Sequence, residues 1–204
     1  MDWVNKYLQI VPINTFIDPI FPVENAIITH AHADHAKPGH NNVLATKHTI
    51  EIMKIRYGEN CANNFQELSF NSPLNVNGVK VTFFPAGHIL GSAQVLLEYQ
   101  KDKINFTGDF KITKDDTCEN FSPVTCDTLV TEATFGLPIF QHPDPEVEIN
   151  KLINSLKNFS NRPHLIGVYA LGKAQRLIKL LRNQGYDETI LSLIHISEPT
   201  RHAS

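Results

Sequence analysis

The sequence has little that would tie it to a membrane, to a secretory route or to a disulfide framework. No apolar run approaches the roughly 20 residues needed to cross a bilayer. The first residues, Met1 to Lys6, lack the basic and apolar regions of a signal peptide. The three cysteines include no Cys-x-x-Cys pair, so nothing indicates a thiolate zinc site or a set of disulfides. We therefore expect a cytoplasmic protein with free thiols and no membrane partner.

Acidic residues are missing from one long stretch of the chain. The net charge of -3 argues against a simple basic coat for nucleic acid. Between residues 151 and 186, however, every charged side chain is basic: Lys151, Lys157, Arg162, Lys173, Arg176, Lys179 and Arg182. Such a segment can face a polyanion, or it can be the solvated surface of helices whose counter-charges lie elsewhere. The sequence leaves both readings open.

Short β-rich runs recur in the first part of the chain, and most are separated by turn residues. They lie at 13–17, 26–29, 43–45, 79–84, 94–99, 104–107 and 129–131. Asn77-Gly78 predicts a tight hairpin, because both central residues of such a turn need positive φ. Residues 101–103 predict another. Helical spacing of Ile50, Met53 and Tyr57 predicts one helix among these strands, with Thr46 as its N-cap and Gly58 as its stop.

The second part of the chain follows a proline-rich stretch that ends at Pro145. Its pattern predicts a helix over 145–158, an apolar strand over 165–170 and a helix over 173–183. The buried stripe of the last helix is expected at i, i+3, i+4 and i+7, on Ala174, Leu177, Ile178 and Leu181. A strand followed by a helix suggests a βα unit.

The densest chemical feature is the run His30-Ala31-His32-Ala33-Asp34-His35, directly after the apolar residues 26–28. Four side chains that can bind metal lie within six residues at the end of a buried strand, which packing alone does not explain. Histidine nitrogens and aspartate oxygens together suit zinc or a similar divalent ion. The bland alternative is a hydrogen-bonded core network.

Two later positions have the character needed to complete a metal site. His88 follows the apolar run at 79–84 and stands between Gly87 and Gly91, which let the backbone turn sharply. Asp109 follows the run at 104–107, directly after Gly108. Each alone has an ordinary reading as a turn residue. Their shared placement after strands favours the metal site.

These residues resemble the His-x-His-x-Asp-His signature of the metallo-β-lactamase superfamily. The resemblance implies an αββα sandwich, an α/β (α+β) fold, that binds two divalent metal ions, zinc or alternatively manganese. It implies His30, His32 and His88 as ligands of the first ion, and Asp34, His35 and a bridging Asp109 as ligands of the second. It also implies that Asp18, in Ile17-Asp18-Pro19, orients a ligand histidine, although an Asp-Pro turn is the alternative.

Such a pair of ions would activate a hydroxide as the nucleophile and stabilise charge on the attacked group. Asp34 and Asp109 would help to hold that hydroxide in line, so no side-chain nucleophile is required. The superfamily hydrolyses lactams, thioesters and phosphodiesters, and the fold alone does not select among them.

Two later segments resemble the β-CASP branch, which processes nucleic acid. Leu129 to Gly136, with Glu132, is similar to the acidic motif that opens the β-CASP insertion, and 167–176 is similar to that branch's strand, glycine turn and helix. Residues 30–40 most resemble ligase-associated DNA exonucleases, which implies DNA as the substrate, Glu132 as a further catalytic residue and a ligase or helicase as partner. Lys37 and His40 would line the substrate approach or lie on the surface. The alternatives are an RNA-processing nuclease and a catalytically dead subunit that binds nucleic acid. A thioesterase would need neither the basic segment nor the Glu132 motif.

The resemblance implies residues 1–135 as the N-terminal part of the metallo-β-lactamase domain and 136–190 as the start of the β-CASP insertion. We expect the chain to be a C-terminally truncated fragment, since the histidines that complete the second metal shell have no match. Residues 191–204, which include His195, resemble translated adapter sequence. We interpret them as a sequencing artefact, the alternative being a native tail.

Overall fold

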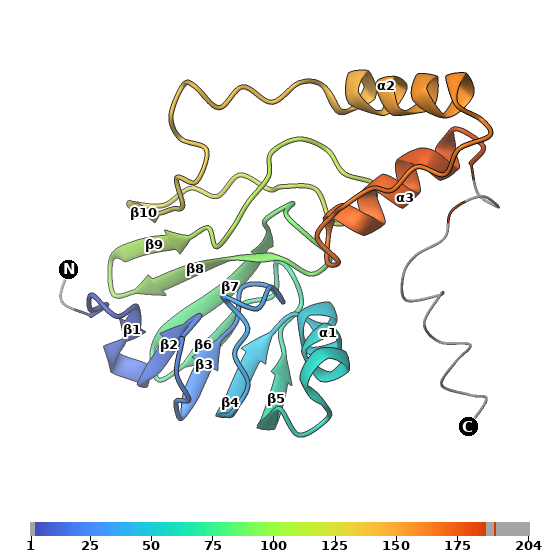
Figure 1. Cartoon of the computed structure of the whole chain (residues 1–204). Coiled ribbons are helices and arrows are strands. Elements are labelled where there is room, and N and C mark those ends of the chain that lie inside the picture. Colours follow the sequence, from blue (N-terminus) through green and yellow to red (C-terminus); the bar gives the residue numbers. More distant parts are fainter. Residues whose placement is uncertain (1–2, 187–189, 191–204) are drawn as a thin grey trace, which may run out of the picture. The chain divides into compact units, whose positions relative to one another are not determined.

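The computed structural model describes residues 3–186 and 190, and its chain divides into two compact units, Met1–Leu137 and Pro138–Ser204. The first unit contains two five-stranded sheets and one α-helix (Figure 1). The second unit contains two α-helices in its described part. None of the described helices has the length and apolar character needed to span a bilayer.

The first sheet has the order β1-β2-β3-β4-β5. Its strands are β1 (Gln9–Ile10), β2 (Thr15–Ile17), β3 (Asn25–Ile27), β4 (His40–Ala45) and β5 (Ala62–Glu67). The last four strands run parallel, and β1 pairs antiparallel with β2. A 3-10 helix, η1 (Val11–Ile13), joins β1 to β2, and helix α1 (Lys47–Tyr57) joins β4 to β5.

The second sheet has the order β10-β9-β8-β7-β6. Its strands are β6 (Leu74–Val76), β7 (Val79–Pro85), β8 (Ala93–Tyr99), β9 (Asp102–Phe106) and β10 (Thr128–Val130). Strands β6 to β9 form an antiparallel meander, and β10 pairs parallel with β9. Both β7 and β9 therefore run opposite to β8, so the carboxyl ends of β7, β9 and β10 meet at one edge of this sheet.

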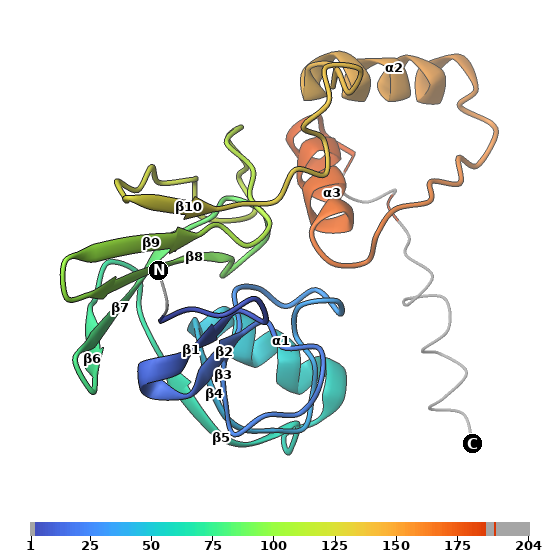
Figure 2. The ribbon, with the colours of Figure 1, turned by 90° about the vertical axis from the view of Figure 1, so that its left-hand side faces the viewer.

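Alternation along the strands divides the apolar residues between two cores. Ile27 packs between the two sheets with Val81, Phe83 and Leu97. Its neighbour Ala26 faces the other side and packs with residues of β4 and with Ile50 and Met53 of α1. Figure 2 shows α1 against the outer face of the first sheet. The predicted mixed α/β sandwich is confirmed.

The predicted Asn77-Gly78 turn and both predicted ends of α1 are confirmed, whereas the second hairpin turn does not lie at 101–103 as predicted. Asn77 and Gly78 both have positive φ, 46° and 85°, and they join β6 to β7. Thr46 caps α1, since its hydroxyl accepts a hydrogen bond from the amide of Thr49, and α1 ends at Gly58. The second hairpin turns at Gln100 and Lys101, because Asp102 already pairs with Tyr99.

The predicted run at 13–17 was wrong in extent, and strands β1 and β5 were not predicted. The run expected at 13–17 is interrupted, since Ile13 ends η1 and Asn14 takes a left-handed conformation before β2 begins. Strand β5 was missed because its sequence, ANNFQE, is polar. It lies at the edge of the first sheet, where most of its side chains face water and no apolar alternation is required.

The second unit has a small apolar core between helices α2 (Pro145–Asn158) and α3 (Lys173–Asn183). Ile149 and Ile153 of α2 are buried with Leu181 of α3, and Leu177 packs against them. Asp144 caps α2 by accepting a hydrogen bond from the amide of Glu146. Both helices confirm the predicted ranges.

The strand predicted at 165–170 is absent from the described residues. These residues form no ladder with another strand, and the side chain of Leu165 is 96% exposed. A strand needs a neighbour for its backbone hydrogen bonds, and the described part of this unit supplies none. The predicted artefact at 191–204 lies outside the described residues. The division of the chain into a metallo-β-lactamase part and an insertion stays a prediction.

Candidate metal centre

The ends of three strands meet at one edge of the sandwich. His30 and His32 follow β3 of the first sheet, whereas His88 and Asp109 follow β7 and β9 of the second. A hydrogen bond from the amide of Ala93 to the carbonyl of Thr29, 2.8 Å long, ties the two sheets together there. The edge therefore collects side chains that lie far apart in the sequence.

The first group comprises His30, His32, His88 and Asp109, whose candidate ligand atoms all lie within 4.8 Å of one another. The Nδ1 atom of His32 lies 3.1 Å from Nε2 of both His30 and His88. An Asp109 oxygen lies 3.7 Å and 3.5 Å from the same two Nε2 atoms. A tetrahedron with zinc–nitrogen bonds of roughly 2.0–2.1 Å has edges of roughly 3.3–3.4 Å. The spacing of these donors fits such an ion.

The three imidazole rings of this group are nearly perpendicular to one another. The interplanar angles are 81° between His30 and His32, 88° between His30 and His88, and 83° between His32 and His88. Rings in this arrangement direct one nitrogen each toward a common point, as ligands of a single ion do. Packed apolar rings would have no reason to bring their nitrogens together.

A second group adjoins the first through Asp109. The Nε2 atom of His35 lies 3.3 Å from Oδ1 of Asp109 and 3.9 Å from Oδ2 of Asp34. The other Asp109 oxygen, Oδ2, faces His30 and His88. Asp34 is exposed, with a side chain that is 79% accessible. One carboxylate is thus positioned between two groups of donors.

Asp18 accepts hydrogen bonds that orient residues of both groups. Its Oδ1 accepts a hydrogen bond from the amide of Thr29, and its Oδ2 accepts one from the Thr29 hydroxyl at 2.6 Å. That hydroxyl lies 3.1 Å from Nδ1 of His30. Because the Thr29 hydroxyl donates its hydrogen to Asp18, it accepts a hydrogen bond from the Nδ1–H group of His30. Nε2 of His30 then carries no hydrogen, and its lone pair faces the first group.

The same carboxylate fixes the second group. Nδ1 of His35 lies 2.8 Å from Oδ2 of Asp18 and donates to it, so Nε2 faces Asp34 and Asp109. Asp18 itself takes a left-handed conformation, with φ of 44°. The structure thus brings Asp18 to the position predicted for a residue that orients ligand histidines. Carboxylate–histidine pairs of this kind set ring orientation and basicity at metal sites.

The pKa values reflect a polar cluster that is largely removed from water. Burial, together with the charges of His35 and His88, lowers the pKa of His30 to about 2. Burial also lowers the pKa of His88. At His35 burial acts in the same direction, but hydrogen bonds to Asp109 and Asp18 outweigh it and raise the pKa to about 10. The hydrogen bond from His35 lowers the pKa of Asp109 to about 2. The electrostatic potential around His35 and Asp109 is therefore negative enough to favour a positively charged group.

Several contacts that hold the centre were not predicted. Nη1 of Arg56, on α1, donates to the carbonyl of Ala31 at 2.7 Å and so fixes the backbone between His30 and His32. The Ser92 hydroxyl accepts from the amides of His88 and Ile89. Ser92 and Thr29 are polar residues inside the predicted motifs, which is a signal that sequence reasoning could have used. The distance of Arg56 from the motif leaves no such signal.

Glu132 lies beside the centre, where its carboxylate accepts hydrogen bonds from two backbone amides. Its Oε1 accepts a hydrogen bond from the amide of Phe110, the residue after Asp109, at 3.2 Å. Its Oε2 accepts from the amide of Thr134. These bonds tie the end of β10 to the turn that presents Asp109. A catalytic role for Glu132 stays a prediction.

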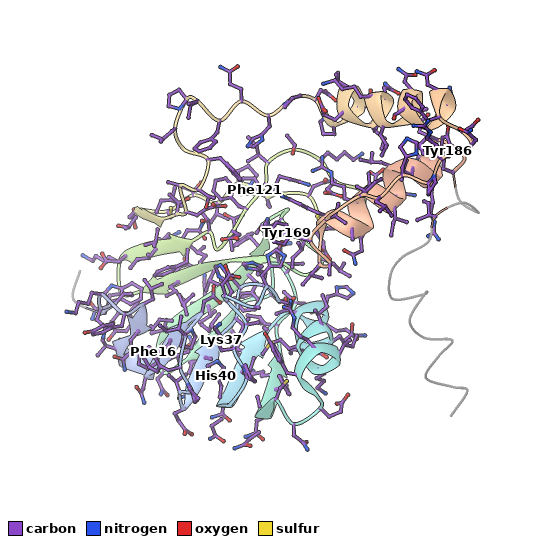
Figure 3. The ribbon with its side chains drawn as sticks, viewed as in Figure 1. Phe16, Lys37, His40, Phe121, Tyr169 and Tyr186 are labelled. Atoms are coloured by element: carbon purple, nitrogen blue, oxygen red, sulfur yellow. The ribbon has the colours of Figure 1, made fainter. Side chains whose placement is uncertain are left out.

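The placement predicted for His40 was wrong. His40 begins β4 and is 1% exposed, because its ring packs inward and its Nδ1 accepts a hydrogen bond from the amide of Val23. Lys37, three residues before His40, is half-buried. Figure 3 labels both residues on the first unit. His40 can therefore neither line a substrate approach nor form part of the surface.

The donor set fits divalent metal ions in both number and chemistry. Imidazole nitrogens and carboxylate oxygens suit zinc and, less strongly, manganese. Within the described residues, the first group alone offers four donors, and His35, Asp34 and the second Asp109 oxygen offer three more. The assignment of these residues as ligands stays a prediction of the motif. All three cysteines are free, as expected, and none belongs to either group of donors.

Curated proteins similar to the chain include enzymes of DNA and RNA metabolism. A probable DNA ligase of Opitutus terrae is 30% identical over 189 residues, which cover 87% of this chain and 18% of the ligase. Endoribonuclease ysh-1 of Neurospora crassa is 28% identical over 195 residues, covering 78% and 23%. Cleavage and polyadenylation specificity factor subunit 3 of Dictyostelium discoideum is 35% identical over 121 residues, covering 57% and 15%. The chain spans less than a quarter of each of these relatives.

Among solved structures, a protein of unknown function from Enterococcus faecalis matches with a TM-score of 0.56 and 17% identity. The match covers 80% of this chain and 45% of that protein. At this identity, the likeness supports the fold alone. No model of a known protein family matches the sequence.

Proposed function

The chain belongs to the β-CASP branch of the metallo-β-lactamase superfamily, and we propose that it forms the metal-binding part of a nuclease that hydrolyses phosphodiester bonds. The activity, substrates and partners of the longer relatives are carried over here as proposals. The proposed ligands are His30, His32, Asp34, His35, His88 and Asp109.

The position of Asp109 is the observation that supports this proposal most directly. Its two carboxylate oxygens face two different groups of donors, His30 and His88 on one side and His35 on the other. A carboxylate placed in this way would be able to hold one cation on each side. Two divalent ions, when bound, would activate a water molecule for attack and stabilise negative charge on the attacked phosphate.

The remaining residues of the centre orient and hold these groups. Asp18, directly at His35 and through the Thr29 hydroxyl at His30, favours the tautomers in which Nε2 of each ring would be available to a metal ion. Arg56 and Glu132 fix the backbone next to His32 and Asp109. Asp34 is the most exposed of the proposed ligands, so it is the one best placed to meet a substrate. No side chain of the chain needs to act as a nucleophile.

DNA is the substrate that we propose first, and digestion from an end is the mode. The similarity to a probable DNA ligase covers 87% of the chain, whereas the similarity to the Dictyostelium relative covers 57%. A ligase or helicase partner is proposed from the same resemblance. The endoribonucleases among the relatives favour RNA as the second candidate.

The test is a hydrolysis assay on the zinc- or manganese-loaded protein with end-labelled single-stranded DNA, duplex DNA and RNA. We expect a ladder of products from DNA, and loss of all products in Asp109→Asn and Asp34→Ala variants that still fold. Products from RNA alone would favour the second candidate. Three intact substrates with a metal-loaded protein would contradict the proposal and leave a catalytically dead binding subunit as the alternative.

A further inference from the structure

The loop between β7 and β8 carries His88 and is held through the backbone of one glycine. Gly91 lies three residues after His88, is buried and has a φ of 77°. Its amide donates a hydrogen bond to Oε2 of Glu119 at 3.1 Å. Its carbonyl accepts hydrogen bonds from the hydroxyls of Thr46 and Thr49, at 2.7 Å and 3.1 Å. We call the side chains of Thr46, Thr49 and Glu119 the Gly91 clamp.

The packing around Gly91 leaves no room for a side chain. A Cβ at this position would lie 2.8 Å from both Oγ1 of Thr46 and Cβ of His48. This close approach lets two threonine hydroxyls reach the Gly91 carbonyl from the start of α1. Thr46 and Thr49 are 4% and 0% exposed, so water does not compete for these hydrogen bonds. The start of α1 and the loop that carries His88 are therefore packed in one defined arrangement.

Hydrogen bonds within the loop connect Gly91 to His88. The hydroxyl of Ser92, the next residue after Gly91, accepts from the amides of His88 and Ile89 at 3.1 Å and 3.2 Å. The amide of Ser92 donates to the carbonyl of Ile89 at 2.9 Å. Residues 88–92 therefore form a single closed turn. A shift of Gly91 would shift the backbone of His88 with it.

Helix α1 contacts the backbone beside candidate ligands from both sheets. At its start, it holds Gly91 and so the loop that carries His88 of the second sheet. From its last turn, Arg56 donates to the backbone carbonyl between His30 and His32 of the first sheet. The nitrogens of these three rings must keep the spacing of a tetrahedron for one ion to bind all of them. A single helix is thus placed to fix the donors of one sheet relative to those of the other.

We propose that the Gly91 clamp positions His88 as a ligand of the first metal ion. The inference rests on the proposed function, in which His88 binds that ion. None of the side chains of the clamp belongs to the first group of donors, so each acts through the backbone of Gly91 and is a positioning residue. Thr46 also caps α1 through the amide of Thr49, so replacing Thr46 would disturb the helix as well. Thr49 and Glu119 are therefore the members whose substitution is informative.

The test measures the zinc affinity of the whole 204-residue chain by competition with a chromophoric chelator. Thr49→Val keeps the shape and the approximate helix propensity of the side chain, but it removes one donor to Gly91. It should weaken zinc binding roughly 2- to 10-fold. Adding Glu119→Ala should bring the loss to roughly 10- to 100-fold. The visible absorption spectrum of the cobalt-loaded protein should change in both variants, because it depends on the geometry of the donors. Thr49→Ser and Glu119→Gln keep the hydrogen-bonding oxygens and should resemble the parent.

Two matched controls remove the same chemical groups outside the clamp. Thr82→Val removes the hydroxyl of another buried threonine, which is 6% exposed and lies on β7. Glu59→Ala removes a 79% exposed carboxylate that pairs with Lys54 of α1 at 3.2 Å. Both should bind zinc like the parent. Urea unfolding in EDTA gives the stability of each variant without metal, which separates a loss of stability from a loss of zinc affinity.

Parent-like zinc affinity and cobalt spectra in the Thr49→Val and double variants would overturn the inference, even if those variants were less stable, because the clamp would then serve the fold alone. The proposed function fails separately. Clamp-dependent zinc binding without hydrolysis of nucleic acid removes the nuclease and keeps the clamp. If the parent binds no zinc, the ligand assignment of His88 fails, and amide exchange of residues 86–92 in EDTA decides about the clamp. Faster exchange in the double variant keeps its hold on His88, whereas unchanged exchange overturns it.

Discussion

Replacing Thr29 by valine tests the link between Asp18 and the ligand histidines. Valine keeps the shape of the side chain, which is 1% exposed, but it removes the hydroxyl that donates to Asp18 and accepts from His30. The Nδ1–H group of His30 then loses its acceptor inside the protein. An unsatisfied buried donor costs about 1–3 kcal/mol.

The same change should weaken metal binding. Removal of a hydrogen-bonding partner behind a ligand histidine typically costs about 10- to 100-fold in affinity, which corresponds to about 1.4–2.7 kcal/mol. We expect this loss in a competition titration with a chromophoric zinc chelator, accompanied by a lower thermal midpoint. Thr29→Ser retains the hydroxyl and should bind zinc like the parent. Equal zinc affinity in the valine and serine variants would refute the relay through Thr29.

Three further substitutions test other parts of the first unit. Arg56→Met should weaken zinc binding about tenfold, because the Ala31 carbonyl loses its donor, while Lys54→Met on the same helix should leave the chelator titration unchanged. Gly108→Ala should lower the free energy of unfolding by about 1–3 kcal/mol, since a Cβ there would lie 2.8 Å from the Thr29 hydroxyl. Gly167→Ala is the control, because a Cβ there meets no atom within 4 Å and the backbone φ is not positive. Equal midpoints of the two variants in urea would contradict this prediction. Asp115→Asn should destabilise at neutral pH: burial raises the pKa of Asp115, but hydrogen bonds from Lys111 and Thr117 outweigh burial and lower it. Because the pKa of Asp115 is lowered in the folded state, its carboxylate stabilises the fold above the ordinary Asp pKa of about 3.9, and this stability is lost as pH falls through the folded-state pKa. The free energies of unfolding of parent and variant should therefore converge in strong acid. Asp116→Asn, at an exposed position, is the control.

Much of the sandwich could be predicted because its strands obey the period of two. Ala26 and Ile27 enter different cores, and Asn77-Gly78 has few conformations other than the tight turn. Strand β5 could not be predicted, because an edge strand exposed to water has no need of apolar alternation. The run at 165–170 shows the converse: apolar residues predict a strand, but only a partner can make one.

The residue types of the candidate centre could be predicted from the sequence, but most of the hydrogen bonds that hold them in place could not. The motif from His30 to His35 is dense enough to indicate metal binding without a structure. His88 and Asp109 depended on their positions after strands, and the structure brings both of them to His30. His40 misled because a histidine gives no sign of whether it faces water or the core. Arg56 lies on a helix 25 residues beyond Ala31, and no spacing rule connects the two.

The two groups of donors come from both sheets, which gives a bound ion a mechanical role as well as a chemical one. His30 and His32 leave the first sheet, and His88 and Asp109 leave the second. An ion held by all four is therefore a cross-link between the layers, closing a loop of the chain as a disulfide does in other small domains. Its binding free energy adds directly to that of folding. Chelation should loosen the sandwich at this edge first, while the layers remain joined through the Phe83 and Leu97 core.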